Sequence, residues 1–176
     1  MAKSSKKSFK ESVADYAALS ERIGRRQFAP VYLLMGEEPY FIDMLAERLG
    51  ETILSPEAGL RPTVVYGRDT EAGAIVNFCR QMPMMGAFQV VIIREAQTLR
   101  RIDQLSLYTS APSPTTILVL CHKEKGLDKR SQLYKQIEAK GAVFESVAPR
   151  DYEIAGWLGD FVRSKDVRST RKRQPC

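Results

Sequence analysis

Apolar residues recur at two different spacings along this chain, and the two spacings alternate. Steps of three and four residues predict amphipathic helices at 9–25, 39–49, 70–81, 97–107 and 129–140, and a last helix that begins near residue 151. Continuous apolar or β-branched runs between them predict strands at 31–35, 63–66, 88–93, 115–120 and 142–145. Apolar strands separated by helices are typical of a parallel sheet covered on both faces. We therefore expect a three-layer α/β/α fold with a five-stranded parallel sheet.

The composition narrows the class of protein. The chain has 176 residues, 44% of them hydrophobic, which suits a single globular domain. No apolar run approaches the roughly 18–20 residues that span a bilayer, and no apolar core follows the N-terminal lysines, so we expect no membrane contact and a cytoplasmic location. Three scattered cysteines and a single histidine argue against a disulfide framework and against a metal site.

The positive charge of the chain is concentrated at its ends. Of the net charge of +6, residues 1–10 contribute +4 and residues 163–176 contribute +5, which leaves −3 for the body between them. Basic ends can contact phosphate backbones, but flexible solvated ends are the commoner case. We expect a flexible basic N-terminus at 1–8, one folded domain at 9–163 and a basic C-terminal tail at 164–176.

The turn after the first predicted strand is where a fold of this class would bind phosphate. A working phosphate loop reads GxxxxGK[ST], because glycine lets the backbone close round the phosphates and lysine meets their charge. Counting from Gly36, Phe41 stands in place of the second glycine, Ile42 in place of the lysine, and Asp43 in place of the serine or threonine. Three losses together predict that this turn does not bind ATP productively.

Charged residues near the same turn also argue against ATP binding. Glu37 and Glu38 lie within it and would repel a triphosphate. The strand at 88–93 is followed by Arg94, where NTPases of this kind place a magnesium-binding aspartate, and Glu95 alone cannot hold the metal and polarise water. We interpret Glu95 as a solvated loop acid and expect no cofactor and no enzyme activity. An active NTPase remains the alternative that these substitutions oppose.

A methionine-rich segment separates the third predicted helix from the strongest predicted strand. Residues 81–86, here called the methionine corner, read Gln-Met-Pro-Met-Met-Gly. Pro83 ends the helix and Gly86 releases the chain into the strand, which predicts that Met84 and Met85 lie on a surface corner. Exposed methionines suit an adaptable apolar anchor for a partner. The alternative is that they fill the core between the helix and the strand.

Three segments of the chain resemble the delta subunit family of bacterial DNA polymerase III: residues 30–43, residues 66–93, and residues 129–144. The resemblance extends over about residues 9–165. It implies a degenerate AAA+-like domain in a clamp-loader subunit, a non-enzymatic part of the polymerase III holoenzyme in DNA replication. The partners it implies are the sliding clamp (the beta subunit), the other clamp-loader subunits in the full-length protein, and primed DNA within the complex.

The resemblance also implies a role for the methionine corner. The family inserts an apolar wedge into a hydrophobic groove of the clamp, and the wedge is similar to short clamp-binding peptides that read Gln, Leu, any residue, Leu, Phe. Residues 81–85 match that spacing, with Met85 where an aromatic is common. Carried over by position, Met82, Met84 and Met85 would form the wedge, and Gln81 would be a hydrogen-bonding partner.

The end of the chain departs from the family. Family members continue into a helical lid and a collar domain, whereas residues 164–176 have no apolar periodicity, so we expect both to be absent from this chain. The basic ends leave a third hypothesis, a nucleic-acid-binding module, which the mildly acidic body opposes.

Overall fold

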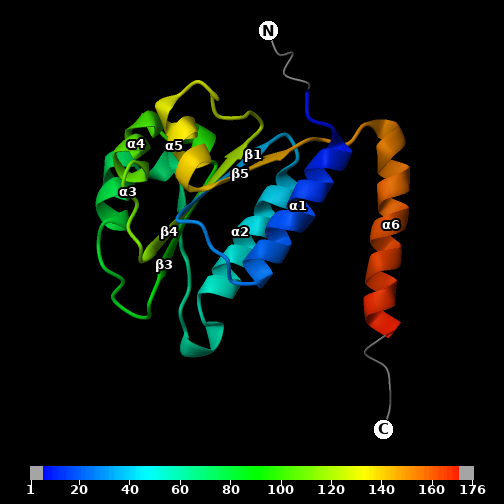
Figure 1. The fold of residues 1–176 in the computed structure, drawn as a ribbon, viewed down its shortest axis with the longest axis horizontal. Helices are drawn as coiled ribbons and strands as arrows, with labels where there is room; N and C mark the ends of the chain where they lie inside the picture. The colour runs from blue at the N-terminus through cyan, green and yellow to red at the C-terminus, as the bar shows by residue number, and fades with distance from the viewer. Residues whose placement is uncertain (1–5, 171–176) are drawn as a thin grey trace.

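The computed structural model describes residues 6–170, so most of the predicted flexible N-terminus and residues 171–176 of the predicted tail lie outside the described residues. A five-stranded sheet forms its centre (Figure 1). The strands are β1 (Val31–Gly36), β2 (Thr63–Tyr66), β3 (Gln89–Arg94), β4 (Thr116–Lys123) and β5 (Ala142–Ser146). Their order in space is β2-β3-β4-β1-β5, and each pairing is parallel. The predicted five-stranded parallel sheet is confirmed.

Helices cover both faces of the sheet, as Figure 1 shows. They are α1 (Phe9–Gly24), α2 (Pro39–Ile53), α3 (Ala72–Cys79), α4 (Ser106–Thr109), α5 (Gln132–Lys140) and α6 (Asp151–Thr170). Because successive strand residues point to opposite faces, Tyr32 and Leu34 of β1 pack into the core under α1 and α2, whereas Leu33 and Met35 pack into the core under α3 and α5. The three-layer prediction is therefore confirmed as well.

Local signals explain where several helices begin. Ser8 and Glu11 form a reciprocal capping box at the start of α1. Pro39 occupies the first turn of α2, where its missing N–H costs little. The hydroxyl of Ser131 accepts a hydrogen bond from the N–H of Tyr134, so α5 begins at residue 132, three residues later than the sequence suggested.

The predicted helix at 97–107 is wrong. The chain there forms two 3₁₀ turns, Ala96–Thr98 and Ile102–Leu105, followed by the four-residue α4. Glu95 and Arg101 precede these turns with φ of 52° and 53°. A left-handed residue cannot continue a right-handed helix, so the apolar spacing is satisfied by separate turns instead.

Two observations in the structure concern the ends of the domain expected at residues 9–163. Lys7 is tied to the fold, since its Nζ lies 2.6 Å from the Asp15 carboxylate and donates a 3.1 Å hydrogen bond to the carbonyl of Glu145. α6 continues through Thr170, past the boundary expected at residue 163. It stands beside the body in Figure 1, and its Trp157 packs edge-on against Phe9. Across residues 6–170, every helix is too short or too polar to cross a bilayer.

Candidate functional site

The turn after β1 is closed by β5. The N–H of Glu37 donates to the carbonyl of Ser146 at 3.2 Å, and the N–H of Glu38 donates to the Ser146 hydroxyl at 3.2 Å. That hydroxyl donates in turn to the carbonyl of Met35 at 3.3 Å. The next available amide, that of Tyr40, donates to the carboxylate of Glu38 at 3.0 Å. In a phosphate loop such amides point at the ligand, whereas here they are bonded within the protein.

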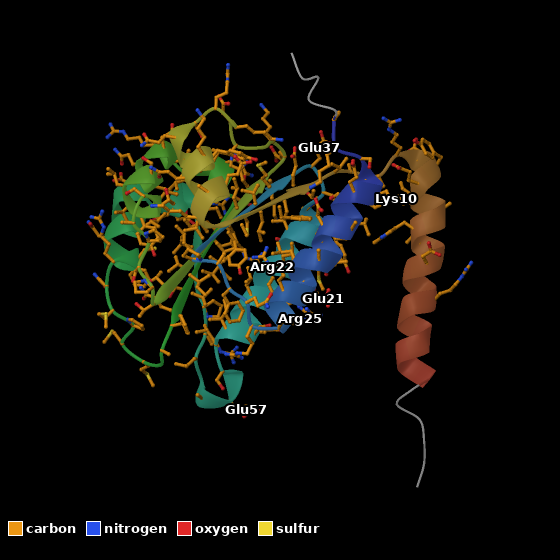
Figure 2. The ribbon with its side chains drawn as sticks, viewed as in Figure 1. Lys10, Glu21, Arg22, Arg25, Glu37 and Glu57 are labelled. Atoms are coloured by element: carbon orange, nitrogen blue, oxygen red, sulfur yellow. The ribbon has the colours of Figure 1, made fainter. Side chains whose placement is uncertain are left out.

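The side chains of the same turn are built into the core or face solvent. Phe41 and Ile42, at the positions of the motif's glycine and lysine, are 4% and 0% exposed. The ring of Phe41 lies 4.9 Å from that of Tyr16, centroid to centroid. Glu37 is exposed near the start of α1 (Figure 2). A lysine at position 42 would therefore be buried among apolar groups instead of meeting a phosphate.

An ion-pair cluster lies where the magnesium ion of an NTPase would be expected. Asp43 of α2 lies 2.9 Å from the Nζ of Lys123 and 3.4 Å from Nη1 of Arg94. The three side chains are 24–39% exposed, so the pairs are partly shielded from water. Two fixed cations at the ends of β3 and β4 would repel a divalent cation and already neutralise the only nearby carboxylate in the cluster.

Sequence reasoning identified Asp43 and Arg94 but missed Lys123 and Ser146. The register pairs Gly36 at the end of β1 with Lys123 on one side and with Ser146 on the other. Both residues could have been assigned to this turn only by predicting that β1 lies between β4 and β5 in the sheet. Spacing along the chain alone carries no such signal.

Glu95 does not join the ion-pair cluster in any contact that the structure records. It is half-buried, and its carbonyl accepts a 2.7 Å hydrogen bond from the hydroxyl of Thr98. Within residues 6–170, no three His, Cys, Asp or Glu side chains are grouped so as to hold a metal ion. The described part of the chain therefore offers no ready set of metal ligands beside Glu95.

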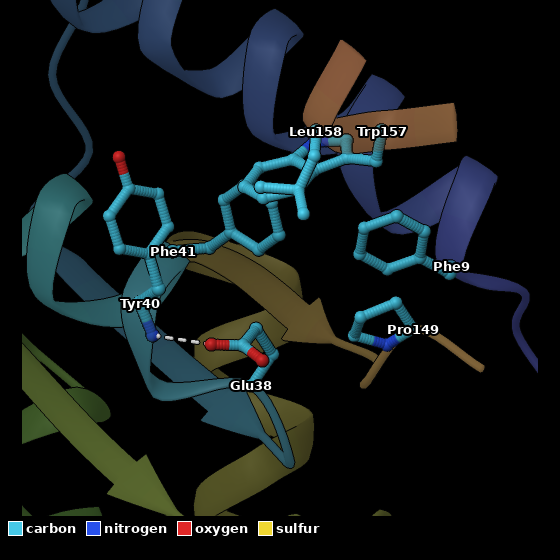
Figure 3. Close-up of a pocket in the computed structure, with 7 residues that line it drawn as sticks. All are labelled: Phe9, Glu38, Tyr40, Phe41, Pro149, Trp157 and Leu158. Atoms are coloured by element: carbon cyan, nitrogen blue, oxygen red, sulfur yellow. Dashed lines mark hydrogen bonds between the residues drawn. The ribbon is translucent and has the colours of Figure 1, made fainter. Parts of the chain in front are cut away.

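A cleft of about 400 Å³ lies beside the turn, between the starts of α1 and α2 and the first half of α6. Figure 3 shows the rings of Phe9, Phe41 and Trp157 around it, with Tyr40 at one side. Among the described side chains that line it, Glu38 alone is charged. An apolar cleft with one carboxylate offers no cation for a triphosphate. Sequence periodicity did not reveal the cleft, because its walls come from three separate helices.

The methionine corner and the turn after β1 lie at opposite ends of the parallel strands. The corner precedes the start of β3, whereas the turn follows the end of β1. Met82, Met84 and Met85 are 76%, 99% and 69% exposed. α3 ends at Cys79, and the loop that carries the corner joins it to β3 at the lower left of Figure 1. The alternative that these methionines fill the core is thus excluded.

Larger apolar side chains flank the corner. Phe78 on α3 and Phe88 just before β3 are 36% and 37% exposed, and Gln81 is also exposed. Gly86 has φ of 77°, a left-handed conformation that turns the chain back toward the strand. The corner and its flanks together expose five large apolar side chains.

The parallel strand order β2-β3-β4-β1-β5 is that of an AAA+-type α/β fold, and the turn after β1 lacks the motif residues of a phosphate loop. A solved RuvB variant from Thermotoga maritima shares the fold, with a TM-score of 0.50 and 16% identity over 77% of this chain and 44% of its own. The family described as DNA polymerase III, delta subunit, matches residues 32–147, and the chain belongs to that family.

Two matches from Bacillus subtilis, one of sequence and one of structure, fit this placement. The DNA polymerase III subunit delta of strain 168 is 23% identical over 128 residues, 66% of this chain and 37% of the relative. The solved structure of the DNA clamp loader delta protein (YqeN) has a TM-score of 0.71 and 20% identity, and covers 85% of this chain and 48% of its own. The chain therefore spans less than half the length of either relative.

Proposed function

We propose that this chain binds the sliding clamp through the methionine corner and helps to open it, without hydrolysing ATP itself. The observation that carries the proposal is the exposure of Met82, Met84 and Met85, between 69% and 99%, on a loop that projects from the sheet. Three exposed methionines on one short loop are costly for a soluble protein unless a partner covers them. Membership of the delta subunit family supports the clamp as that partner.

The proposed work is binding, with no covalent step. The methionine side chains would enter an apolar groove of the clamp, and the exposed amide of Gln81 would supply a hydrogen bond at its rim. The ring would open because its open form binds the wedge better, since a ligand shifts an equilibrium only by its differential affinity for the two states. Other clamp-loader subunits would supply the ATP hydrolysis, and primed DNA would be bound within the full complex.

The turn after β1 supports the absence of ATP hydrolysis. Its amides bond to Ser146 and Glu38, and Asp43 is paired with Arg94 and Lys123. We expect a fluorescent ATP analogue with magnesium to show no saturable binding to this chain. Saturable, magnesium-dependent binding would contradict this expectation and leave the clamp-binding part of the proposal untouched.

The decisive experiment measures binding of the chain to purified sliding clamp, beside a Met84→Ala/Met85→Ala variant. Truncating a hot-spot residue costs roughly 2 kcal/mol or more, so the variant should bind well over tenfold more weakly. Met44→Ala is the matched control, because Met44 is 37% exposed on α2, away from the corner. A folded parent that does not bind, or a double variant that binds as tightly as the parent, would contradict the proposal.

A further inference from the structure

One glutamine links the two ends of the loop that carries the methionine corner: its side chain bonds the start of the loop, and its backbone follows the end. Nε2 of Gln89 lies 3.3 Å from the carbonyl oxygen of Phe78, 3.0 Å from that of Gln81 and 2.8 Å from the hydroxyl of Thr116, so its two N–H groups serve three acceptors and one hydrogen is shared between two of them. The Thr116 hydroxyl donates in turn to the carbonyl of Cys79 at 2.9 Å. The last carbonyls of a helix have no partner within it, so these bonds satisfy the end of α3 from outside.

The position of Gln89 explains why it can do this. It is the first residue of β3, directly after the loop, and it pairs with Thr116, the first residue of β4. Its own N–H donates to the carbonyl of Thr115 at 2.9 Å, so its backbone is fixed to the sheet. The two carbonyl acceptors also settle which end of the side-chain amide faces the loop, because only the NH₂ group can donate to them.

A second tie holds the start of the loop on its other side. Nη2 of Arg80 donates to the carbonyl of Leu107 in α4 at 3.0 Å. Residues 78–81 are therefore fixed to β3, β4 and α4, whereas Met82, Met84 and Met85 project from this base into solvent. A rigid base beneath exposed apolar side chains is the arrangement expected of a preorganised binding loop.

We propose that Gln89 is a positioning residue for the methionine corner, and that it presents the three methionines in one arrangement before the clamp is bound. This inference rests on the proposed function, since its consequence is measured in clamp affinity. Gln89 contributes by lowering the entropy that the loop loses on binding, not by touching the clamp. It does so by closing the loop, because its amide reaches the carbonyl of Gln81 at one end while its backbone begins β3 at the other.

The test compares clamp affinity of the parent with that of Gln89→Met, which keeps the length of the side chain and removes its donors. We expect about tenfold weaker binding, in line with the gain that preorganisation of a loop provides. Gln89→Lys, whose ammonium can donate to the same carbonyls, should recover most of the affinity. Ser131→Ala is the control for stability, because it removes a helix cap of α5 far from the corner and should leave affinity unchanged.

Two further measurements separate a positioning role of Gln89 from a general loss of stability. Added to Met84→Ala/Met85→Ala, the Gln89→Met change should weaken binding no further, because Gln89 acts through those side chains. In the free chain, methyl relaxation should show greater mobility of the corner methionines in Gln89→Met than in the parent, with that of Met44 unchanged.

Each outcome has a distinct meaning. If the parent binds and Met84→Ala/Met85→Ala does not, but Gln89→Met binds like the parent, the wedge stands and the positioning role is overturned. If Gln89→Met and Ser131→Ala weaken binding equally, the effect is one of stability and the positioning role is again overturned. If the parent itself fails to bind the clamp, the proposed function falls, and the role of Gln89 in it falls as well.

Discussion

Gly36 and Ser146 lie against each other at the ends of β1 and β5, so close that a Cβ at residue 36 would come within 2.7 Å of the Ser146 amide nitrogen. Gly36 also has φ of 129°, which side chains rarely tolerate. This close approach lets Ser146 bond the amides of Glu37 and Glu38. The glycine that opens a phosphate loop in an NTPase thus serves here to pack two strands together.

Gly36→Ala should therefore be strongly destabilising. The methyl group would overlap the backbone of Ser146, which is too constrained to move aside, and the φ of residue 36 would add strain. We expect a loss of about 3 kcal/mol in the free energy of unfolding, measured by urea denaturation. Gly73→Ala on α3 is the control, because nothing lies within 4 Å of a Cβ there. Stability should be unchanged or up to about 1 kcal/mol higher in the control. Equal effects of the two changes would contradict this account of Gly36.

The ion-pair cluster gives a second prediction. Asp43→Asn would leave Arg94 and Lys123 facing each other without their shared carboxylate. Since all three side chains are partly exposed, we expect a loss of only about 1 kcal/mol in unfolding free energy. The loss should shrink in about 1 M salt, which screens the repulsion between the two cations.

A second change in that background tests the cause. Lys123→Met removes one of the two cations and keeps the length of the side chain, so it should restore part of the stability lost in Asp43→Asn. If Lys123→Met lowers stability equally in the parent and in the Asp43→Asn variant, the two residues are not coupled and the cluster has no electrostatic role.

The fold was predictable because its strands are continuous apolar runs with helices between them, a pattern that permits few arrangements other than a covered parallel sheet. The region after β3 was not, because Glu95 and Arg101 adopt left-handed conformations that apolar spacing does not reveal. Periodicity describes which residues face the core. It does not determine whether one helix or several turns present them.

In the candidate sites, too, features set by local sequence were predictable and features set by the strand order were not. The surface position of the methionine corner was predictable because Pro83 and Gly86 act locally on the backbone. The contributions of Ser146 and Gln89 were not, since each depends on which strands are neighbours in the sheet. A side chain at a strand end bonds across the sheet, so its role follows from the strand order and register and not from its neighbours in sequence.

His122 gives a prediction about pH. It lies on β4 with 8% of its surface exposed, and burial lowers its pKa below the ordinary value of 6.5. Below about pH 6.5 the unfolded chain therefore takes up a proton that the folded chain does not, so stability should fall as the pH falls toward the folded pKa. His122→Gln should reduce the difference in unfolding free energy between about pH 7.5 and about pH 5.5. An unchanged difference in the variant would show that other groups cause the dependence.

The last prediction concerns Cys79 and Cys121, which are both fully buried and whose pKa values burial raises to about 12. A thiol must be ionised and accessible to react, so in a Cys176→Ser background neither should react with a thiol reagent at about pH 8 until the protein opens. Cys79 should react first, because it ends α3 beside the methionine corner, whereas Cys121 lies within the central strand β4. Gln89→Met should speed the reaction of Cys79 and leave that of Cys121 unchanged, since it frees only the end of α3. Equal acceleration of both thiols would mean that Gln89 stabilises the whole fold and not the base of the corner.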